Sequence, residues 1–350
     1  MNQLNSPATT LPSQDSPAQQ QKPSRILLVR RGPLGNCLLT LPLTMAIRRR
    51  FPHAHLSWAT DSHLIDILNS ATPIDDWVAL ESGNCQSPRA LLAKVRQLRE
   101  PDFDLVIDTE GTIGSGLISW LTAAPHRVGI MSPSGGPGRW FYHQVVKAHQ
   151  NVPTASALAL SDALGAQVDC CTWEPTSSAV SRNTVSQFIR NYHLGCGFVV
   201  MSPASFPTAN QWPTKRFGTL ARYLGQLDGL TTVAMWSSEA ERKLAMTVVK
   251  NSGGHALLAP RFCLDDLTNV VSRAKLVISY EPGILWFAER CRTIGVNLSP
   301  CNIMETPLES VENLAAASPV KTNRPLQKIT IESAYEACFQ HLGRADSAAA

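Results

Sequence analysis

A turn rich in glycine follows the first apolar run of the chain and holds residues that could bind an anion or position a reacting hydroxyl. Gly32 and Gly35 lie in this turn, and Asn36 follows directly. Glycine lets the backbone come close to a ligand, and the N-terminus of the helix expected next carries partial positive charge. An ordinary turn between a strand and a helix needs the same glycines, so both interpretations stay open.

A second candidate is the loop of small and polar residues at positions 202–213. The hydroxyls of Ser205 and Thr208, together with backbone amides, could hold a diphosphate. Pro213 suits the first turn of the helix expected after the loop. A plain surface loop has the same composition, so this segment alone does not decide between the two.

A carboxylate at the end of a later strand provides the third candidate. Glu281 follows that strand directly, and Gly283 and the start of a helix come next. A carboxylate in this position is well placed to contact a ligand. It can equally well compensate the positive end of the helix without binding anything.

Three consecutive arginines, Arg48–Arg50, end the first expected helix. They could contact a phosphorylated acceptor or acidic lipid headgroups. Arginines at a helix C-terminus more often complement the helix dipole on a solvated face, and we favour that interpretation.

Several kinds of site are excluded because the sequence lacks their motifs. The histidines are scattered without a His-Glu-x-x-His spacing, and neither a Gly-x-Ser-x-Gly motif nor a Walker loop occurs. The nine cysteines include no Cys-x-x-Cys pair and their number is odd, which argues against a zinc site or a disulfide framework. Unpaired cysteines favour a reducing compartment. We therefore expect a cytoplasmic protein that uses neither a metal nor another cofactor.

The charge balance narrows the class of protein further. The chain has 31 Lys and Arg against 27 Asp and Glu, a formal net charge of +4, which does not indicate a nucleic-acid-binding protein. This mild excess allows an anionic small ligand, or a transient peripheral contact with the cytoplasmic face of the inner membrane. No stretch approaches about 18 consecutive apolar residues, so no membrane-spanning helix is expected.

A repeated order of strand, turn and helix must position these candidate residues. Short apolar runs such as 25–29, 103–108, 198–201 and 276–278 predict buried parallel strands, and the first segment between them predicts a helix over 37–50. Repeated right-handed strand–helix–strand units give an α/β fold of two doubly wound, Rossmann-like domains. The carboxyl ends of both sheets would face a common ligand cleft.

The strand–helix pattern pauses near residues 170–190, which we interpret as the hinge between the domains. The N-terminus is rich in Pro, Gln and Ser and lacks the basic start and apolar run of a signal peptide. We predict a disordered leader over 1–24, an N-terminal domain over 25–180, a C-terminal domain over 181–328, a helix over 329–343 that packs back across the hinge, and a frayed tail over 344–350.

Sequence fragments in a fixed order along residues 25–342 carry a family resemblance. The fragments are 26–42, 50–54, 103–111, 127–129, 212–217 and 264–267. Together they resemble glycosyltransferase family 9, the ADP-heptose:lipopolysaccharide heptosyltransferases. The resemblance implies the GT-B fold, in which two Rossmann-like domains face a central cleft.

The resemblance also implies an activity, the inverting transfer of heptose from ADP-heptose to a core sugar of lipopolysaccharide. In the family, an aspartate after the first strand acts as general base and deprotonates the acceptor hydroxyl for in-line attack on the anomeric carbon. Loop residues and helix amides of the second domain hold the donor diphosphate without a metal. The implied partners are a nucleotide-sugar donor and a glycan or lipopolysaccharide acceptor.

Two of the family's polar positions are changed in the loops described first. Asn36 stands where the family has its catalytic aspartate, and an amide cannot take a proton. Asn210 replaces the basic residue expected just before Trp212. Lys215 or Arg216, a turn further on, is the candidate to replace that lost charge.

A third change lies in the segment that begins at Glu281. The family's Asp-[Ser/Thr]-Gly-x-x-His pattern keeps its acid as Glu281 and its glycine as Gly283, but the histidine is Trp286. Glu239 aligns with the family's glutamate that holds the nucleotide ribose. The predicted donor-binding residues are therefore Ser205, Thr208, Asn210, Glu239, Glu281 and Gly283.

Two functions of different classes follow from this mixture of matches and changes. The favoured one is an active glycosyltransferase with altered site chemistry. The alternative is a catalytically inactive relative that binds a nucleotide, a glycan or a partner protein. A nucleotide-sugar epimerase of GT-B shape is a third option, which no set of residues demands.

Overall fold

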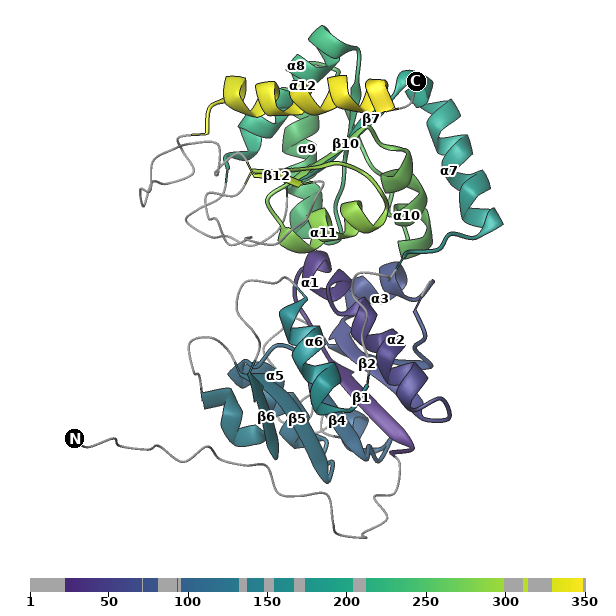
Figure 1. The fold of residues 1–350 in the computed structure, drawn as a ribbon, viewed down its shortest axis with the longest axis vertical. Helices are drawn as coiled ribbons and strands as arrows, with labels where there is room; N and C mark the ends of the chain where they lie inside the picture. Colours follow the sequence, from purple (N-terminus) through teal and green to yellow (C-terminus); the bar gives the residue numbers. More distant parts are fainter. Residues whose placement is uncertain are drawn as a thin grey trace, which may run out of the picture.

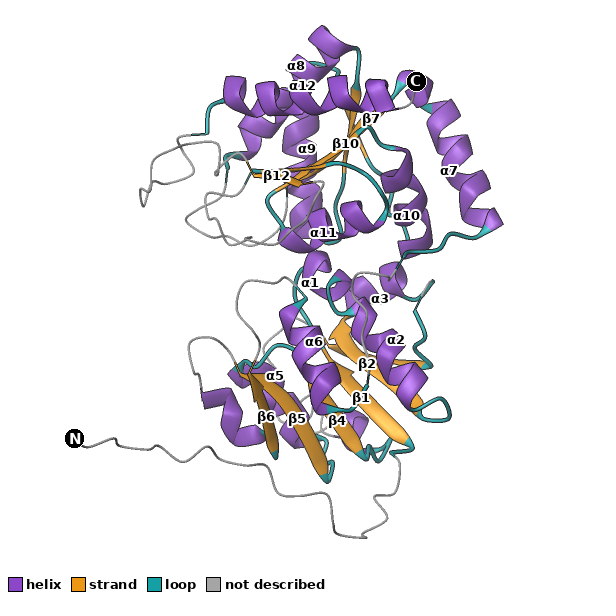
Figure 2. Cartoon of the chain, in the orientation of Figure 1, coloured by secondary structure: helices purple, strands orange, loops and turns teal. Residues whose placement is uncertain are grey.

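The computed structural model describes residues 23–70, 72–80, 93, 96–131, 137–147, 154–166, 174–203, 212–298, 311–313 and 329–348. Two α/β halves lie one above the other along the long axis of the molecule (Figure 1). Each half contains one sheet with helices packed around it, and Figure 2 separates the strands from the helices by colour.

The first half is built on a parallel sheet of six described strands in the order β3-β2-β1-β4-β5-β6. The strands are β1 Arg25–Val29, β2 His55–Asp61, β3 Asp76–Leu80, β4 Leu105–Asp108, β5 His126–Met131 and β6 Gln144–Lys147. The helices are α1 Leu34–Leu38, α2 Leu41–Arg50, α3 Ser62–Leu68, α5 Ile113–Leu121 and α6 Ala155–Ala163, with a 3-10 helix η1 Pro137–Phe141.

The second half repeats this arrangement with the strand order β12-β11-β10-β7-β8-β9, again parallel throughout. Its strands are β7 Phe198–Ser202, β8 Thr231–Ala234, β9 Ala256–Leu258, β10 Leu276–Ser279, β11 Gly295–Asn297 and β12 Val311–Asn313. Its helices are α7 Ala179–Asn191, α8 Thr214–Asp228, α9 Glu239–Asn251, α10 Leu264–Arg273, α11 Pro282–Arg290 and α12 Ile331–Ala348, with a 3-10 helix η2 Leu194–Cys196.

Both sheets have the doubly wound order, so the predicted fold class is confirmed. The first strand of each half lies between the second and fourth, which places the reversal of strand order at the carboxyl ends of β1 and β7. Ligands of such folds bind in the crevice outside these carboxyl ends. Because α1 follows β1 and α11 follows β10, the contact between these two helices brings the carboxyl edges of the two sheets face to face.

The strands form where the apolar runs are buried on both faces. Residues 26–29 of β1 are fully shielded from solvent, as expected for a central parallel strand. The single helix predicted over 37–50 is instead two helices, α1 and α2, because the chain restarts its helix at Leu41. Pro42, in the first turn of α2, has no amide hydrogen to donate to a preceding turn, so a helix begins there more readily than it continues.

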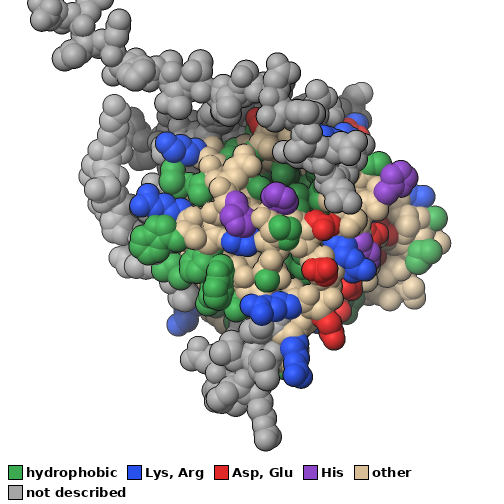
Figure 3. Space-filling view, turned by 90° about the horizontal axis from the view of Figure 1, so that it is seen from below, with side chains coloured by type: hydrophobic (Ala, Val, Ile, Leu, Met, Phe, Trp, Pro, Cys, Tyr) green, Lys and Arg blue, Asp and Glu red, His purple; other side chains and the backbone are tan. Residues whose placement is uncertain are grey.

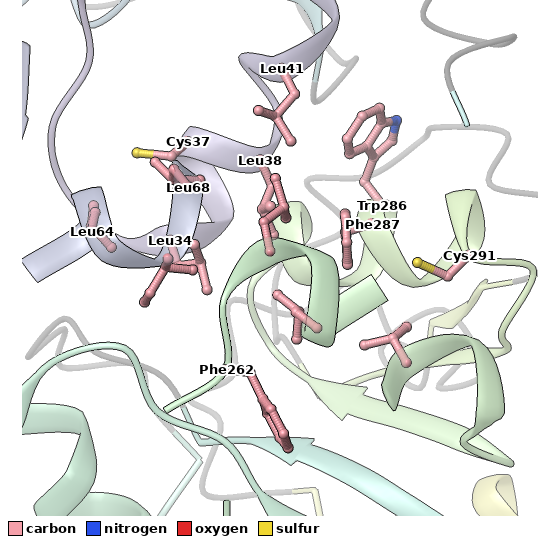
Figure 4. Close-up of a cluster of buried hydrophobic side chains, with 14 of the residues drawn as sticks. Leu34, Cys37, Leu38, Leu41, Leu64, Leu68, Phe262, Trp286, Phe287 and Cys291 are labelled. Carbon is pink, nitrogen blue, oxygen red and sulfur yellow. The ribbon is translucent and has the colours of Figure 1, made fainter. Parts of the chain in front are cut away.

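One cluster of buried apolar side chains crosses from the first half into the second. It includes Leu28 and Ile107 of the first sheet, Leu34 and Leu38 of α1, and the residues Val277, Trp286 and Phe287 of the second half. Figure 4 draws the part of this cluster where α1 meets α11. The two halves therefore share a core at the carboxyl edges of their sheets.

The C-terminal helix α12 packs on α8 of the second half. The ring of Tyr335 lies edge-on to that of Tyr223, with centroids 6.1 Å apart. The domain boundaries given above, and a packing of residues 329–343 across the hinge, stay predictions. Within the described ranges, no helix is both long enough and apolar enough to cross a membrane.

Candidate functional site

A small cavity lies at the carboxyl ends of β7, β8 and β10, where the two halves meet. Ser202, Trp236, Glu241 and Glu281 of the second half form part of its wall, and Leu34 reaches it from α1 of the first half. Its free volume of about 20 Å³ has room for a single water molecule. The place where a doubly wound domain binds its ligand is thus present but nearly closed in this arrangement.

Glu241 is a carboxylate held inside this cavity by its own helix terminus. Its Oε2 accepts hydrogen bonds from the backbone amide and the hydroxyl of Ser237, both at 2.6 Å. Ser238 caps α9 and accepts from the amide of Glu241 at 3.3 Å. Only 9% of the surface of Glu241 is exposed, and these hydrogen bonds fix the position of its carboxylate.

The predicted ribose ligand, Glu239, lies on another side of α9. Its side chain is 76% exposed and stands 3.7 Å from the guanidinium of Arg242. Successive helical residues are rotated by about 100°, so two residues that are two positions apart face nearly opposite ways. Glu241 is therefore the glutamate of this helix that faces the cavity, and the one that the sequence prediction missed.

The turn at Gly35 touches the start of α11 through backbone atoms. A Cβ atom on Gly283 would lie 1.9 Å from the carbonyl oxygen of Gly35. A Cβ atom on Gly35 would lie 2.9 Å from Oε2 of Glu281. Gly35 and Gly283 are thus needed for close approach, whereas Gly32 has a φ of 95° in the left-handed region that favours glycine.

Asn36 lies beside this contact in α1, half-buried. Its backbone amide donates to the carbonyl of Pro33, and its own carbonyl accepts from the hydroxyl of Thr40. No hydrogen bond of its side-chain amide is found among the described residues. The following residue, Cys37, is no substitute base, because burial raises the pKa of its thiol to about 12.

Two carboxylates of the first half hold the turn that precedes Asn36. Asp61, at the end of β2, accepts from the amide of Gly32 at 2.9 Å. Glu110 accepts from the amide of Arg31 and lies 3.6 Å from the guanidinium Nε of the same residue. Both carboxylates are therefore already engaged in fixing the backbone of the turn.

A third carboxylate, Asp108, is fully buried at the end of β4. The hydroxyl of Tyr142 donates to it at 2.6 Å, and the backbone amide of Glu110 donates at 2.8 Å. Burial raises the pKa of Asp108, against the effect of these hydrogen bonds. This group closes the β4 turn and does not face the cavity.

Trp286, which the sequence analysis predicted to replace a histidine, belongs to the core shared by the two halves. It is 4% exposed, and its neighbour Phe287 is 1% exposed. Figure 4 draws both rings on α11 near Leu38 and Leu41 of the first half. The loss of a polar group at this position is consistent with the apolar contact that α11 makes there.

The structure leaves the predicted diphosphate loop untested. Ser205, Thr208 and Asn210 lie outside the described residues. Arg216, one of the two cations considered as a replacement, donates to the carbonyl of Ile329 at 2.9 Å. The other, Lys215, is exposed on α8.

The arginines that end α2 support the structural interpretation. Arg48 donates to the carbonyl of Ala54 at 2.7 Å and pairs with Asp75 at 2.5 Å. It therefore fastens the end of α2 to the loops around β2. No group of three or more His, Cys, Asp or Glu able to hold a metal ion occurs in the described part of the chain.

Three comparisons with known proteins agree with one another. The family model described as glycosyltransferase family 9 (heptosyltransferase) matches residues 91–290, more than half of the chain. Lipopolysaccharide heptosyltransferase 1 of Pseudomonas aeruginosa is 22% identical over 288 residues, 74% of this chain and 74% of that protein.

Solved structures of the same kind share the fold. The glycosyl transferase family 9 protein from Veillonella parvula has a TM-score of 0.68 at 20% identity, over 92% of this chain and 98% of its own. The E. coli heptosyltransferase WaaC with ADP-2-deoxy-2-fluoro heptose has a TM-score of 0.63 at 16% identity, over 90% and 99%. The two facing Rossmann-like halves are thus those of a GT-B fold.

Proposed function

Because the chain belongs to glycosyltransferase family 9, the heptosyltransferase family, we propose that it transfers a sugar with inversion from a nucleotide-sugar donor. The donor resembles ADP-heptose, and the acceptor is lipopolysaccharide or another glycan. The observation that carries this proposal is the cavity between the halves, which has the carboxylates of Glu241 and Glu281 in its wall. The protein acts in the cytoplasm, without a metal.

In this proposal the second half binds the donor. Glu241 accepts the ribose hydroxyls, in the role that the sequence comparison gave to Glu239, because Glu241 is the one that lines the cavity. The diphosphate lies near the N-terminus of α11, where the partial positive charge of the helix dipole favours an anion. The loop that contains Ser205, Thr208 and Asn210 supplies further contacts.

The donor requires the two halves to move apart. A nucleotide sugar needs a pocket of several hundred Å³, whereas the free volume here is about 20 Å³. Separating the backbone contact of Gly35 with Gly283 would withdraw Leu34 from the cavity. The arrangement described is therefore the closed one.

The general base in this proposal is Glu281. Its side chain lines the cavity and lies against Gly35, next to Asn36. Its carboxylate takes the proton of the acceptor hydroxyl as the acceptor oxygen bonds to the anomeric carbon. The bond from that carbon to the diphosphate breaks, and the nucleoside diphosphate leaves.

Turnover of a panel of nucleotide sugars, measured as release of the nucleoside diphosphate, tests this proposal. We expect Glu281→Gln to lower turnover at least about a hundredfold while nucleotide affinity stays within about threefold. Glu174→Gln, at an exposed glutamate paired with Arg292, is the matched control and should transfer like the wild type. Unchanged transfer by Glu281→Gln would rule out this base.

A second candidate function is favoured by the residues that lie between the halves. Asn36 brings an amide to the position of the family's base, and Trp286 and Leu34 fill the space between the halves with apolar groups. These features suit a relative that binds a nucleotide, a glycan or a partner protein without catalysis.

Calorimetry with ADP and ADP-sugars separates the two candidates. Binding without any turnover supports the non-catalytic form, and transfer to any acceptor ends it. If the wild type is inert towards the whole panel but Asn36→Asp gains turnover, the transferase proposal is wrong.

A further inference from the structure

The helix α5 turns large apolar side chains towards solvent. Ile113, Leu117 and Trp120 are 56%, 42% and 51% exposed, and their spacing of four and three residues puts them on one side of the helix. The opposite side buries small groups instead, namely Ser115, Gly116 and Ser119. Because Ile118 and Leu121 pack on the core as well, α5 carries apolar side chains on its outward as well as its inward side.

Specific contacts determine which side of α5 faces inward. The hydroxyl of Ser119 donates to the buried Asp108, and Ser115 completes a capping box with Thr112. A Cβ atom on Gly116 would lie 2.7 Å from the ring of Phe141, so only glycine allows η1 to pack so closely. The inward side is thus fixed by these contacts, and they leave the three exposed apolar side chains on the outside.

Neighbouring elements extend this apolar surface. Trp140 of η1 is 75% exposed, and η1 packs directly on α5. Val145 of β6 is 39% exposed and points to the opposite side of the sheet from Val146, which packs on the shared core. We call Ile113, Leu117, Trp120, Trp140 and Val145 together the α5 face.

The chain segment that carries the α5 face has basic but no acidic residues. The sequence has no Asp or Glu between Glu110 and Asp162, and Glu110 is turned inward to Arg31. Arg139 and Lys147 are exposed within this segment, on η1 and β6. In the view from below, Figure 3 shows hydrophobic side chains gathered at the left edge with Lys and Arg beside them.

We propose that the α5 face docks on a membrane surface with anionic headgroups. Exposed indole rings prefer the boundary between headgroups and acyl chains, and aliphatic side chains gain by leaving water there. Arg139 and Lys147 add attraction to anionic lipid, which no acidic side chain of the segment opposes. The α5 face gives a location to the membrane contact that the charge balance allows. This proposal does not depend on whether the protein transfers a sugar.

Binding of the full chain to vesicles tests the proposal. We expect the wild type to float with vesicles of phosphatidylethanolamine and phosphatidylglycerol and to bind pure phosphatidylcholine vesicles at least about fivefold more weakly. The double variant Leu117→Glu, Trp140→Glu should bind the anionic vesicles at least about tenfold more weakly than the wild type. Failure of the wild type to bind the anionic vesicles would overturn the proposal.

The matched control places the same change on other surfaces. Val180 on α7 and Leu227 on α8 are 75% and 65% exposed, so Val180→Glu, Leu227→Glu removes as much exposed apolar surface away from the α5 face. This control should bind vesicles like the wild type. Equal loss in the control and the α5-face variant would mean that the face is not the site.

The charge and the alternative occupant are checked separately. Arg139→Ser, Lys147→Ser should lower binding to anionic vesicles at least about fivefold without affecting nucleotide binding, and rising salt should have the same effect.

Sedimentation velocity tests a second copy of the chain as the occupant. If the α5-face variant converts an oligomer into a monomer and leaves vesicle binding unchanged, the face is an interface between copies and the membrane proposal is wrong.

Discussion

The buried carboxylate of Glu241 accepts stronger hydrogen bonds than a neutral amide at the same position would accept. Both donors of Ser237 point at one oxygen of its carboxylate, which leaves the second oxygen for a ligand hydroxyl. A hydrogen bond to a charged group contributes about 1.5–3 kcal/mol, roughly twice a neutral one. The nucleotide affinity should therefore depend on this side chain more than on any exposed glutamate.

We predict that Glu241→Gln weakens the binding of ADP by at least about tenfold, because the amide loses the charge that strengthens the bond to a ribose hydroxyl. Titration calorimetry measures the affinity. Glu239→Gln, on the same helix but facing solvent, should bind ADP like the wild type. If Glu239→Gln weakens ADP binding and Glu241→Gln does not, Glu239 is the residue that binds the ribose.

At this scale the sequence predicted which residues lie together better than it predicted the direction of each side chain. Gly35, Glu281 and Gly283 were each predicted to lie at a ligand cleft, and the structure brings these three together. Which of Glu239 and Glu241 enters the cavity depends on the rotation of α9 about its axis. That rotation is set by the cap at Ser238, which lies one position before Glu239 and three before Glu241.

The elements α1 and α11 meet through two glycines, and this makes their contact sensitive to one methyl group. The carbonyl of Gly35 occupies the space where any side chain at position 283 would begin. An added methyl must push the two helices apart or distort one of them. The contact therefore tolerates no side chain at position 283 in the closed arrangement.

We predict that Gly283→Ala lowers the free energy of unfolding by about 1–3 kcal/mol, and that solution scattering shows a larger radius of gyration. Gly195→Ala is the control, because a Cβ atom there has no neighbour within 4 Å; it should change stability by less than about 0.5 kcal/mol. A Gly283→Ala protein as stable and compact as the wild type would mean that the halves are separated in solution.

Elements with strong patterns were predictable, and those that depend on a single residue were not. The strands at 25–29 and 276–278 are continuous apolar runs, and the structure has them as β1 and β10. The helix over 37–50 was predicted whole because its apolar pattern is unbroken, although Pro42 divides it. In α5 the apolar residues alone do not identify the buried side, because they lie on both sides of the helix while Ser115, Gly116 and Ser119 are buried.

The molecule as a whole is joined by the apolar cluster that crosses between its halves. Leu34 belongs to α1 but lines a cavity whose other walls come from the second half. Because neither half buries this surface alone, the unfolding of one exposes the core of the other. Two domains that share a core in this way should unfold together.

We predict a single calorimetric unfolding transition for the wild type and two for Leu34→Asp. An aspartate in the first turn suits α1 itself, so its effect falls on the contact with the second half, where a charge would be buried without a partner. Leu227→Asp, at an exposed site on α8, should keep the single transition. Two transitions in the wild type would show that the halves are independent.

How the halves meet could not be predicted from local patterns. The sequence indicated two doubly wound domains with a cleft between their carboxyl edges, which follows from strand order alone. That the cleft is filled depends on residues more than two hundred positions apart, such as Leu34 and Phe287. No periodicity within one segment contains that information.

The backbone contact of Gly35 with Gly283 has a consequence for how this sequence can vary over evolutionary time. A side chain at position 283 is compatible only with a relative in which the two helices stay apart, whatever residue stands at position 35, because the clash is with its backbone carbonyl. Relatives that keep Gly283 can still adopt the closed arrangement. Relatives that have lost it should rest with the cleft open.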